Sequence, residues 1–191
     1  MASGNRGKLR EIARILADLN FTVVPQSDFN VSEADETGDT FVANALIKAR
    51  HAAAATGLPA IADDSGLAVD ALQGRPGVFS ARYAGPGAND AKNIDKLLHE
   101  LAEIDDIDRG ATFHCAACFV TPDSDDALIA KGSWRGSIAR QRSGERGFGY
   151  DPVFIDAELG VTSAQLSAEE KNLRSHRGKA LAELARLLGA R

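Results

Sequence analysis

The chain has 191 residues, of which 44% are hydrophobic, 26% charged and 6% aromatic. Because a domain commonly spans roughly 100–200 residues, this length predicts a single domain over residues 1–191, at most divided into two lobes that share a core. The proportions exclude a disordered chain, a collagen-like repeat and a disulfide scaffold. The net charge of −5 argues against nucleic acid as a partner, since that binding requires a basic face.

The sequence also predicts a location for the protein. No apolar run approaches the roughly 18 residues of a membrane span, and the first residues contain no stretch typical of a signal peptide. Two cysteines without a targeting segment favour the reduced cytoplasm. We therefore expect a cytoplasmic protein with no membrane partner. Because the net charge is negative, an anionic ligand would have to be bound by a local cluster of cations or by a metal.

Four segments have the apolar spacing and capping residues of helices. They are residues 7–19, 39–56, 89–104 and 175–188. Gly57 is predicted to end the second helix, and Ser175 to cap the last one. Ser167 and Glu170 have the spacing of a capping box just before that last helix.

Short apolar segments between these helices predict strands. They are residues 21–25, 59–62, 67–72, 111–121, 127–134 and 153–155. The segment 63–66, Asp-Asp-Ser-Gly, is interpreted as a turn at the exit of a buried strand, and 122–126 as a hairpin connection. Strands joined first by helices and later by a hairpin predict an α/β fold with a mixed sheet.

A first candidate site is the segment 3–8, Ser-Gly-Asn-Arg-Gly-Lys, directly before the first predicted helix. Arg6, Lys8 and Arg10 place cations at the positive end of the helix dipole, which costs roughly 0.3–1 kcal/mol per charge. Two glycines, free backbone N–H groups and nearby cations are typical of a phosphate cradle. The alternative is an ordinary glycine turn with solvated basic side chains.

A second candidate site is the pair of carboxylates at Asp63 and Asp64. Ligands of α/β sheets gather where strands end, and Mg²⁺ is commonly held by one or two carboxylates together with substrate phosphates. Asp35 and Glu36, in the acidic segment 32–39, could complete such a site. The alternative is a turn rich in Asp and Gly.

Two further patterns favour recognition of a base. Phe148 lies between two glycines, so its ring can be presented for stacking, although it could instead plug the core. Lys171, His176 and Arg177 offer donors of the kind that a carbonyl oxygen on a ligand requires, although a solvated helix start would explain them as well.

Cys115 and Cys118 have the spacing of a redox or zinc motif, but there is no second cysteine pair. Within a strand, positions three apart point to opposite faces, so these two side chains cannot readily pair or share a metal. We predict that both are core residues. The spacing of Ser, His and Asp residues indicates no catalytic triad.

Six motifs in order resemble the non-canonical purine nucleoside triphosphate pyrophosphatases, the inosine triphosphatase (dITP/XTP pyrophosphatase) family. They are Ser-Gly-Asn-x-Gly-Lys at 3–8, Asn-Ala-x-x-Lys-Ala at 44–49, Ala-Asp-Asp-Ser-Gly-Leu at 62–67, Pro-Gly-x-x-Ser-Ala-Arg-Tyr at 76–83, Gly-Phe-Gly-Tyr-Asp-Pro at 147–152, and Glu-Glu-Lys-Asn with Ser-His-Arg-Gly at 169–178. The resemblance covers nearly the whole chain. It implies hydrolysis of ITP, dITP and XTP to the monophosphate and pyrophosphate, with Mg²⁺, by a homodimer. It also implies a long mixed central sheet flanked by helices, in two lobes with an active-site cleft between them.

The resemblance also implies roles for individual residues. Asp64 is the catalytic base and a metal ligand, and Asp35 or Glu36 is a second metal ligand. The remaining implied contacts are to the substrate: Ser3, Gly4, Asn5, Arg6, Gly7, Lys8 and Lys48 to the phosphates, Ser65 to the substrate, and Phe148, Gly149, Tyr150, Asp151, Lys171, His176 and Arg177 around the base. Two positions depart from the family pattern. Only Met1 and Ala2 precede the phosphate segment where the family has a strand, and Asp35 stands where the family has a metal-binding Glu.

Two other classes of function remain open at this point. A pyrophosphatase for modified pyrimidines, or a general phosphatase, would not need Lys171, His176 and Arg177 around a purine carbonyl. A nucleotide sensor without catalysis would not need a carboxylate at Asp64.

Overall fold

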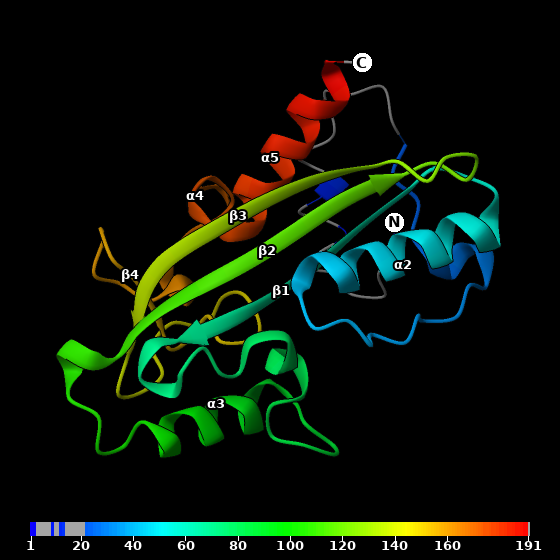
Figure 1. The fold of residues 1–191 in the computed structure, drawn as a ribbon. Coiled ribbons are helices and arrows are strands. Elements are labelled where there is room, and N and C mark those ends of the chain that lie inside the picture. The colour runs from blue at the N-terminus through cyan, green and yellow to red at the C-terminus, as the bar shows by residue number, and fades with distance from the viewer. Residues whose placement is uncertain (3–8, 10–11, 14–21, 191) are drawn as a thin grey trace. The chain divides into compact units, whose positions relative to one another are not determined.

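A computed structural model describes residues 1–2, 9, 12–13 and 22–190 of the chain. Within these residues a four-stranded sheet has the strand order β1-β2-β3-β4. The strands are β1 (Ala60–Val69), β2 (Gly110–Val120), β3 (Ala127–Ile138) and β4 (Phe154–Asp156). The helices are α2 (Phe41–Thr56), α3 (Asp90–Glu100), α4 (Ala168–Arg174) and α5 (His176–Gly189). The predicted α/β fold with a sheet flanked by helices is confirmed (Figure 1).

The chain divides into two compact units. The first comprises Met1–Asp64, Cys115–Gly132 and His176–Arg191, and the second comprises Ser65–His114 and Ser133–Ser175. β1, β2 and β3 each contribute one half to each unit. At the end of the sheet that belongs to the second unit, β3 pairs antiparallel with β4, with Ser137 opposite Ile155.

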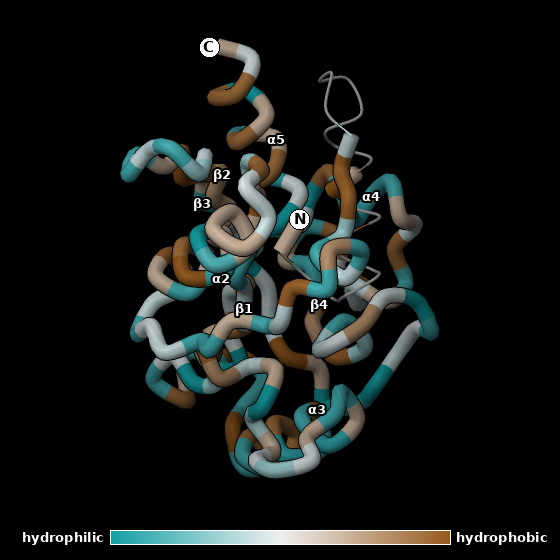
Figure 2. Tube along the Cα trace, turned by 90° about the vertical axis from the view of Figure 1, so that its right-hand side faces the viewer, coloured by the Kyte–Doolittle hydropathy of each residue, from teal (hydrophilic) through white to brown (hydrophobic). Residues whose placement is uncertain are grey.

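In the first unit the two faces of the sheet are covered by different helices. Side chains alternate between the faces of a strand, so odd and even positions have different partners. One cluster joins the alanines of α2 to Ala60, Ala62, Ala116 and Cys118. The other joins α5 to Cys115, Ala117 and Ala130. In Figure 2, hydrophobic and hydrophilic positions alternate along α5, as expected of a helix with one buried face.

Small residues let both helices approach the sheet closely. A Cβ at Gly132 of β3 would overlap the backbone carbonyl of His176, the first residue of α5. Cys115 and Cys118 are buried in the two different clusters, which confirms that they are core residues on opposite faces. Burial raises the pKa of the Cys118 thiol to about 12.

The second unit has an aromatic core. Phe154 lies with its ring centroid 4.6 Å from that of Phe113 and 5.0 Å from that of Trp134. The indole N–H of Trp134 donates to the buried carboxylate of Asp156 at 2.7 Å, so the polar atom of the ring is satisfied. α3 packs on this core through Ile94 and Leu97, and its C-cap residue Leu101 joins the same core.

One predicted feature of the sheet is wrong. Residues 63–66 do not form a turn, because β1 runs without a break from Ala60 to Val69. Asp-Asp-Ser-Gly has turn chemistry, but pairing in the sheet and charged partners for both carboxylates outweigh that local preference. The two predicted strands on either side are therefore one strand, and the carboxylates lie in its interior.

The strand predicted at 21–25 is not found in the described residues either, whereas the remaining boundaries differ less. The described residues 22–25 are not in a strand, although the Met1 amino group donates to the Val24 carbonyl at 2.8 Å. The backbone N–H of Ala2 donates to the carbonyl of Ile61 at 2.9 Å, so the start of the chain lies along β1. α3 ends at Glu100 rather than near residue 104, and β3 continues to Ile138 rather than 134. Of the predicted helix 7–19, the described residues 9, 12 and 13 are helical.

The caps predicted for α2 and the capping box predicted at Ser167 and Glu170 are confirmed, whereas the cap predicted at Ser175 stays a prediction. The backbone N–H of Ala43 donates to the side chain of Thr40 at 3.1 Å, and Gly57 ends α2 with φ +67°. Ser167 and Glu170 form the capping box of α4. Among the described residues, no helix combines the length and apolar character that crossing a membrane requires.

Candidate active site

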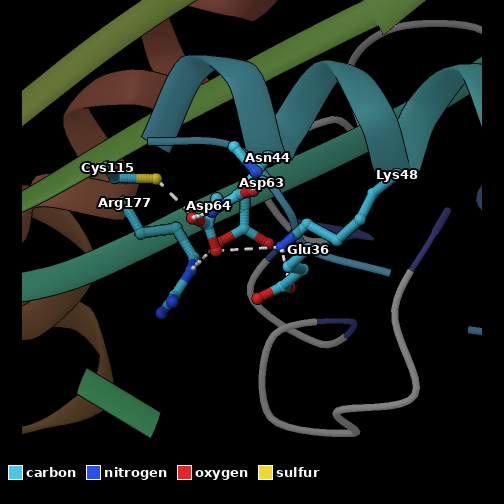
Figure 3. Close-up of polar contacts among 8 residues, drawn as sticks. Glu36, Asn44, Lys48, Asp63, Asp64, Cys115 and Arg177 are labelled. Carbon is cyan, nitrogen blue, oxygen red and sulfur yellow. Dashed lines mark hydrogen bonds and ion pairs between the residues drawn. The ribbon is translucent and has the colours of Figure 1, made fainter. Parts of the chain in front are cut away.

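Asp64, in the middle of β1, is the centre of a polar cluster in the first unit (Figure 3). Its Oδ1 accepts from the Lys48 ammonium at 2.9 Å, and its Oδ2 accepts from the Asn44 amide at 3.3 Å. Asn44 and Lys48 are four residues apart on α2, so they lie on the same face of the helix. One face of one helix therefore supplies a donor to each oxygen of this carboxylate.

Glu36 completes the cluster from the acidic loop before α2. Its carboxylate accepts from the Lys48 ammonium at 2.7 Å, so one cation joins Glu36 and Asp64. Burial lowers the pKa of Lys48, but the charge of Asp64 and the hydrogen bonds that Lys48 donates to Glu36 and Asp64 outweigh this effect. The pKa of Lys48 is therefore raised above its ordinary value, and its side chain is charged at neutral pH.

This cluster fits a divalent cation. Oxygens of Glu36 and Asp64 both accept from the Lys48 ammonium, which marks a position where a divalent cation could contact both carboxylates. Among the described residues no group of three metal-binding side chains is found, and the two carboxylates that converge here are those of Glu36 and Asp64. Two carboxylates plus phosphate oxygens and water are a usual ligand set for Mg²⁺. Of the two predicted acidic-loop candidates, Glu36 contacts Lys48, whereas Asp35 is exposed.

Asp63, the neighbour of Asp64 in β1, has a different environment. Its Oδ2 accepts from Nε of Arg177 in α5 at 3.1 Å, and the thiol of Cys115 lies 3.9 Å from the same oxygen. Both Asp63 and Arg177 are buried. Adjacent strand residues point to opposite faces, so the expectation that the two carboxylates would form one metal site is wrong. Asp63 forms a buried ion pair instead.

The second unit contains another polar cluster, centred on Asp151. Its Oδ2 accepts from the Lys171 ammonium at 2.5 Å and from the backbone N–H of Phe148 at 2.8 Å, and its Oδ1 accepts from the Ser163 hydroxyl at 2.8 Å. Asp151 is buried and its oxygens are thus occupied within the protein. We infer that this residue holds the segment 147–152 in place rather than presenting an open carboxylate.

The aromatic residues of this segment have different surroundings. Phe148 is half-buried, and the Lys171 ammonium lies 4.6 Å from its ring centroid, a cation–π distance. Tyr150 is buried in the aromatic core, and its hydroxyl donates to the Ser80 carbonyl at 2.9 Å. The backbone N–H of Gly149 donates to Asp90 at the start of α3 at 2.7 Å. Of the predicted base-binding residues in this segment, Phe148 thus has the exposed aromatic surface.

Gly147 gives a first test of this arrangement. Its φ is +80°, and a Cβ there would overlap the Asp151 carboxylate. Gly147→Ala is expected to destabilise the protein by more than the roughly 1–2 kcal/mol of a left-handed alanine, because Asp151 must also move. Urea unfolding measures this loss. The matched control is Gly160→Ala, since Gly160 has φ +67° and open space around the added methyl. Equal losses for the two variants would contradict the role of Asp151.

The other predicted site residues are distributed as follows. Ser65 is half-buried in β1 beside Asp64, and His176 is buried at the first position of α5. Lys171 belongs to the second unit, whereas His176 and Arg177 belong to the first. The predicted phosphate segment, residues 3–8, lies outside the described residues.

Two features of these clusters were not predicted from the sequence: the contact of Asn44 with Asp64, and the ion pair of Asp63 with Arg177. Asn44 begins the motif at 44–49, four residues before Lys48, so helical periodicity placed it beside a predicted site residue. The partner of Asp63 had no comparable signal, because Arg177 lies 114 positions further along the chain.

Comparison with known proteins gives matches over almost the whole chain. The sequence profile of the Ham1 family matches residues 1–187. A protein of Pectobacterium atrosepticum named dITP/XTP pyrophosphatase is 54% identical over 182 residues, which cover 95% of this chain and 92% of that protein. One of the same name from Photobacterium profundum is 55% identical over 185 residues, covering 96% and 94%. The solved structure of a HAM1 protein from Coxiella burnetii has a TM-score of 0.92 at 49% identity, covering 99% of this chain and 96% of that chain. The Staphylococcus aureus Ham1 protein has a TM-score of 0.88 at 43% identity, with coverage of 99% and 96%.

Proposed function

The chain belongs to the Ham1 family, and from this membership we propose that it hydrolyses non-canonical purine nucleoside triphosphates such as ITP, dITP and XTP. The products are the monophosphate and pyrophosphate, and the reaction removes these nucleotides from the nucleotide pool. The observation that carries the proposal is the identity of 54–55% to proteins named dITP/XTP pyrophosphatase over more than nine tenths of both chains. The enzyme is thus a hydrolase that acts on acid anhydrides.

Asp64 is the residue we assign as general base. An ionised carboxylate accepts the proton of a water molecule as the oxygen of that water bonds to phosphorus, and the bond that joins the α-phosphate to the β-phosphate breaks. The α-phosphate then leaves with the nucleoside, and the other two phosphates leave as pyrophosphate. Asn44 and Lys48 hold the two oxygens of Asp64, so the carboxylate is oriented before substrate arrives.

Mg²⁺ is the cofactor we propose, with Glu36 and Asp64 as its protein ligands. When bound, Mg²⁺ neutralises charge on the triphosphate and so favours attack at phosphorus. The support is the convergence of the two carboxylates on one ammonium. Asp35 is the weaker candidate, because its side chain is exposed.

The remaining contacts are assigned by the family pattern. We propose that Ser3, Gly4, Asn5, Arg6, Gly7, Lys8 and Lys48 bind the phosphates, with Ser65 also on the substrate. We propose that the purine base is surrounded by seven residues, among which the ring of Phe148 stacks on it. The seven are Phe148, Gly149, Tyr150, Asp151, Lys171, His176 and Arg177. A single domain, a homodimer and a cytoplasmic location complete the proposal.

A product assay tests the proposed reaction. ITP, XTP, GTP and ATP are each incubated with the protein, with and without Mg²⁺, and pyrophosphate and orthophosphate are measured. Pyrophosphate from ITP and XTP, dependent on Mg²⁺, is the expected result. Orthophosphate alone would identify a phosphatase, and tight nucleotide binding without turnover would identify a sensor.

Removal of Lys48 gives a prediction about the cation. Lys48→Ala leaves Glu36 and Asp64 without their shared positive charge, so Mn²⁺ should bind the nucleotide-free protein more tightly while turnover of ITP falls. Electron paramagnetic resonance of free Mn²⁺ measures the binding. The control is Lys131→Ala, at an exposed position of β3, which should leave Mn²⁺ affinity unchanged. Weaker Mn²⁺ binding by Lys48→Ala would show that the two carboxylates do not form the cation site.

A further inference from the structure

Asn44 is fully buried near the start of α2, and its side-chain amide makes two hydrogen bonds in different directions. Its Oδ1 accepts from the backbone N–H of Gly38 at 2.8 Å, and its Nδ2 donates to Oδ2 of Asp64 at 3.3 Å. Because an N–H can only donate and an ionised carboxylate can only accept, the two partners fix which way the amide faces. Asn44 therefore ties the acidic loop to β1.

Gly38 fits this contact closely. A Cβ at position 38 would lie 2.7 Å from the Cβ of Ala43 and 2.8 Å from Oδ1 of Asn44, both too close for real atoms. The backbone of the loop thus rests directly on the first turn of α2. Glu36 is two residues before Gly38, so the place of Gly38 constrains where the Glu36 carboxylate can reach.

α2 therefore makes two bridges from the acidic loop to Asp64. Lys48 joins the Glu36 carboxylate to Oδ1 of Asp64, and Asn44 joins the Gly38 backbone to Oδ2. The bridges differ in charge. The ammonium of Lys48 occupies the carboxylate oxygens that a divalent cation would use, whereas the amide of Asn44 is neutral and holds the other oxygen of Asp64. The Asn44 bridge can persist when a cation is bound.

We propose that Asn44 is the positioning residue of the cation site, which it builds by holding the loop that carries Glu36 in register with Asp64. The proposal rests on the proposed function in one respect, that Glu36 and Asp64 bind the divalent cation. Hydrogen-bonded partners of metal ligands commonly change metal affinity by about 10–100-fold when they are removed. Asn44 acts as such a partner, through its hydrogen bonds to the loop and to Asp64, and does not contact the substrate.

The test is a Mn²⁺ titration of the nucleotide-free protein, followed by electron paramagnetic resonance. Four proteins are compared: wild type, Asn44→Ala, Lys48→Ala and the double variant with both substitutions. The Lys48→Ala background lacks the ammonium that competes with the cation. We expect Asn44→Ala to weaken Mn²⁺ binding about 10–100-fold in both backgrounds. In assays with ITP, the Mg²⁺ concentration needed for half-maximal rate should rise by a similar factor, and excess Mg²⁺ should restore part of the rate.

Asn93 provides a matched control. It is also a buried asparagine on a helix, and its amide accepts from the Ala84 N–H at 2.8 Å and donates to the Ala81 carbonyl at 3.1 Å. Asn93→Ala likewise removes one hydrogen bond accepted from a backbone N–H and one donated to an oxygen, here a backbone carbonyl, and both partners belong to the second unit. Both variants should lower the melting temperature, but only Asn44→Ala should change Mn²⁺ affinity.

The outcomes separate the two levels of the proposal. If neither wild type nor Lys48→Ala binds Mn²⁺, the carboxylate pair is not a cation site and the proposed metal assignment fails. If they bind and Asn44→Ala binds equally well, Asn44 is structural only and the inference is overturned. Should Asn44→Ala not fold, Gly38→Ala displaces the same contact from the loop side and is expected to weaken Mn²⁺ binding as well. An unchanged affinity in that variant would equally overturn the inference.

Discussion

Asp64→Asn is expected to lower kcat for ITP by about 10²–10⁴-fold or more, while nucleotide binding is largely retained. The substitution keeps the shape of the side chain, and an amide oxygen can still accept from Lys48 at the place of Oδ1. It removes the negative charge that would hold a divalent cation and accept the proton of water. Single-turnover kinetics with ITP, together with equilibrium binding of the nucleotide, measure the two effects separately.

The neighbouring residue supplies the contrast for this experiment. Asp63→Asn makes the same chemical change one position away in β1, but on the carboxylate that pairs with Arg177. We expect this variant to lose stability, because it leaves Arg177 without its buried counter-charge, and to retain turnover in the fraction that stays folded. Near-native turnover by Asp64→Asn would refute both the base and the metal role assigned to Asp64.

Features with local signals could be predicted from the sequence. α2 lies between Thr40 and Gly57 as expected, because a capping side chain and a C-terminal glycine act on the residues next to them. The capping box of Ser167 and Glu170, two residues only three positions apart, is also confirmed. The burial of Cys115 and Cys118 in different clusters follows from strand alternation alone.

The interpretation of residues 63–66 as a turn failed for the opposite reason. Turn chemistry is local, but what keeps β1 extended is distant in sequence: pairing with β2, and the Arg177 side chain 114 positions away. Such partners cannot be found by reading along the chain. Yet the departure from local preference does coincide with the candidate site, because charged side chains in a buried strand need those distant partners.

The acidic loop gives an intermediate case. From the sequence both Asp35 and Glu36 are candidates for the cation, since both are carboxylates in the same loop. Glu36 contacts Lys48 in the structure because the loop is fixed two residues later, where Gly38 rests on Asn44. The contact that distinguishes Glu36 from Asp35, its ion pair with Lys48, therefore depends on where the backbone of the loop lies, which composition and spacing do not contain.

Arg177→Ala is expected to destabilise the protein by about 3–5 kcal/mol, because it leaves the carboxylate of Asp63 buried without its cation. Urea unfolding measures the change. The matched control is Arg186→Ala, in which the lost partner is Glu183 and both side chains are largely exposed. Stability should be unchanged in the control, since exposed ion pairs on a helix surface contribute little. A small effect for Arg177→Ala would mean that the buried pair is not what anchors Arg177.

That loss of stability would obscure any role of Arg177 in selecting the base, so selectivity needs a second variant. Asp63→Leu combined with Arg177→Met replaces the buried pair by apolar side chains of similar size, which is often neutral or stabilising. ITP presents a carbonyl oxygen at position 6 of the purine, whereas ATP presents an amino donor there.

If the terminal nitrogens of Arg177 donate to that carbonyl, the double variant should lose kcat/KM for ITP and reject ATP less well. One hydrogen bond of this kind contributes about 1–3 kcal/mol, so the ITP-to-ATP preference should fall about 10- to 100-fold. Equal proportional losses on the two nucleotides would show that Arg177 serves the buried ion pair and the phosphates, and that the base is selected elsewhere.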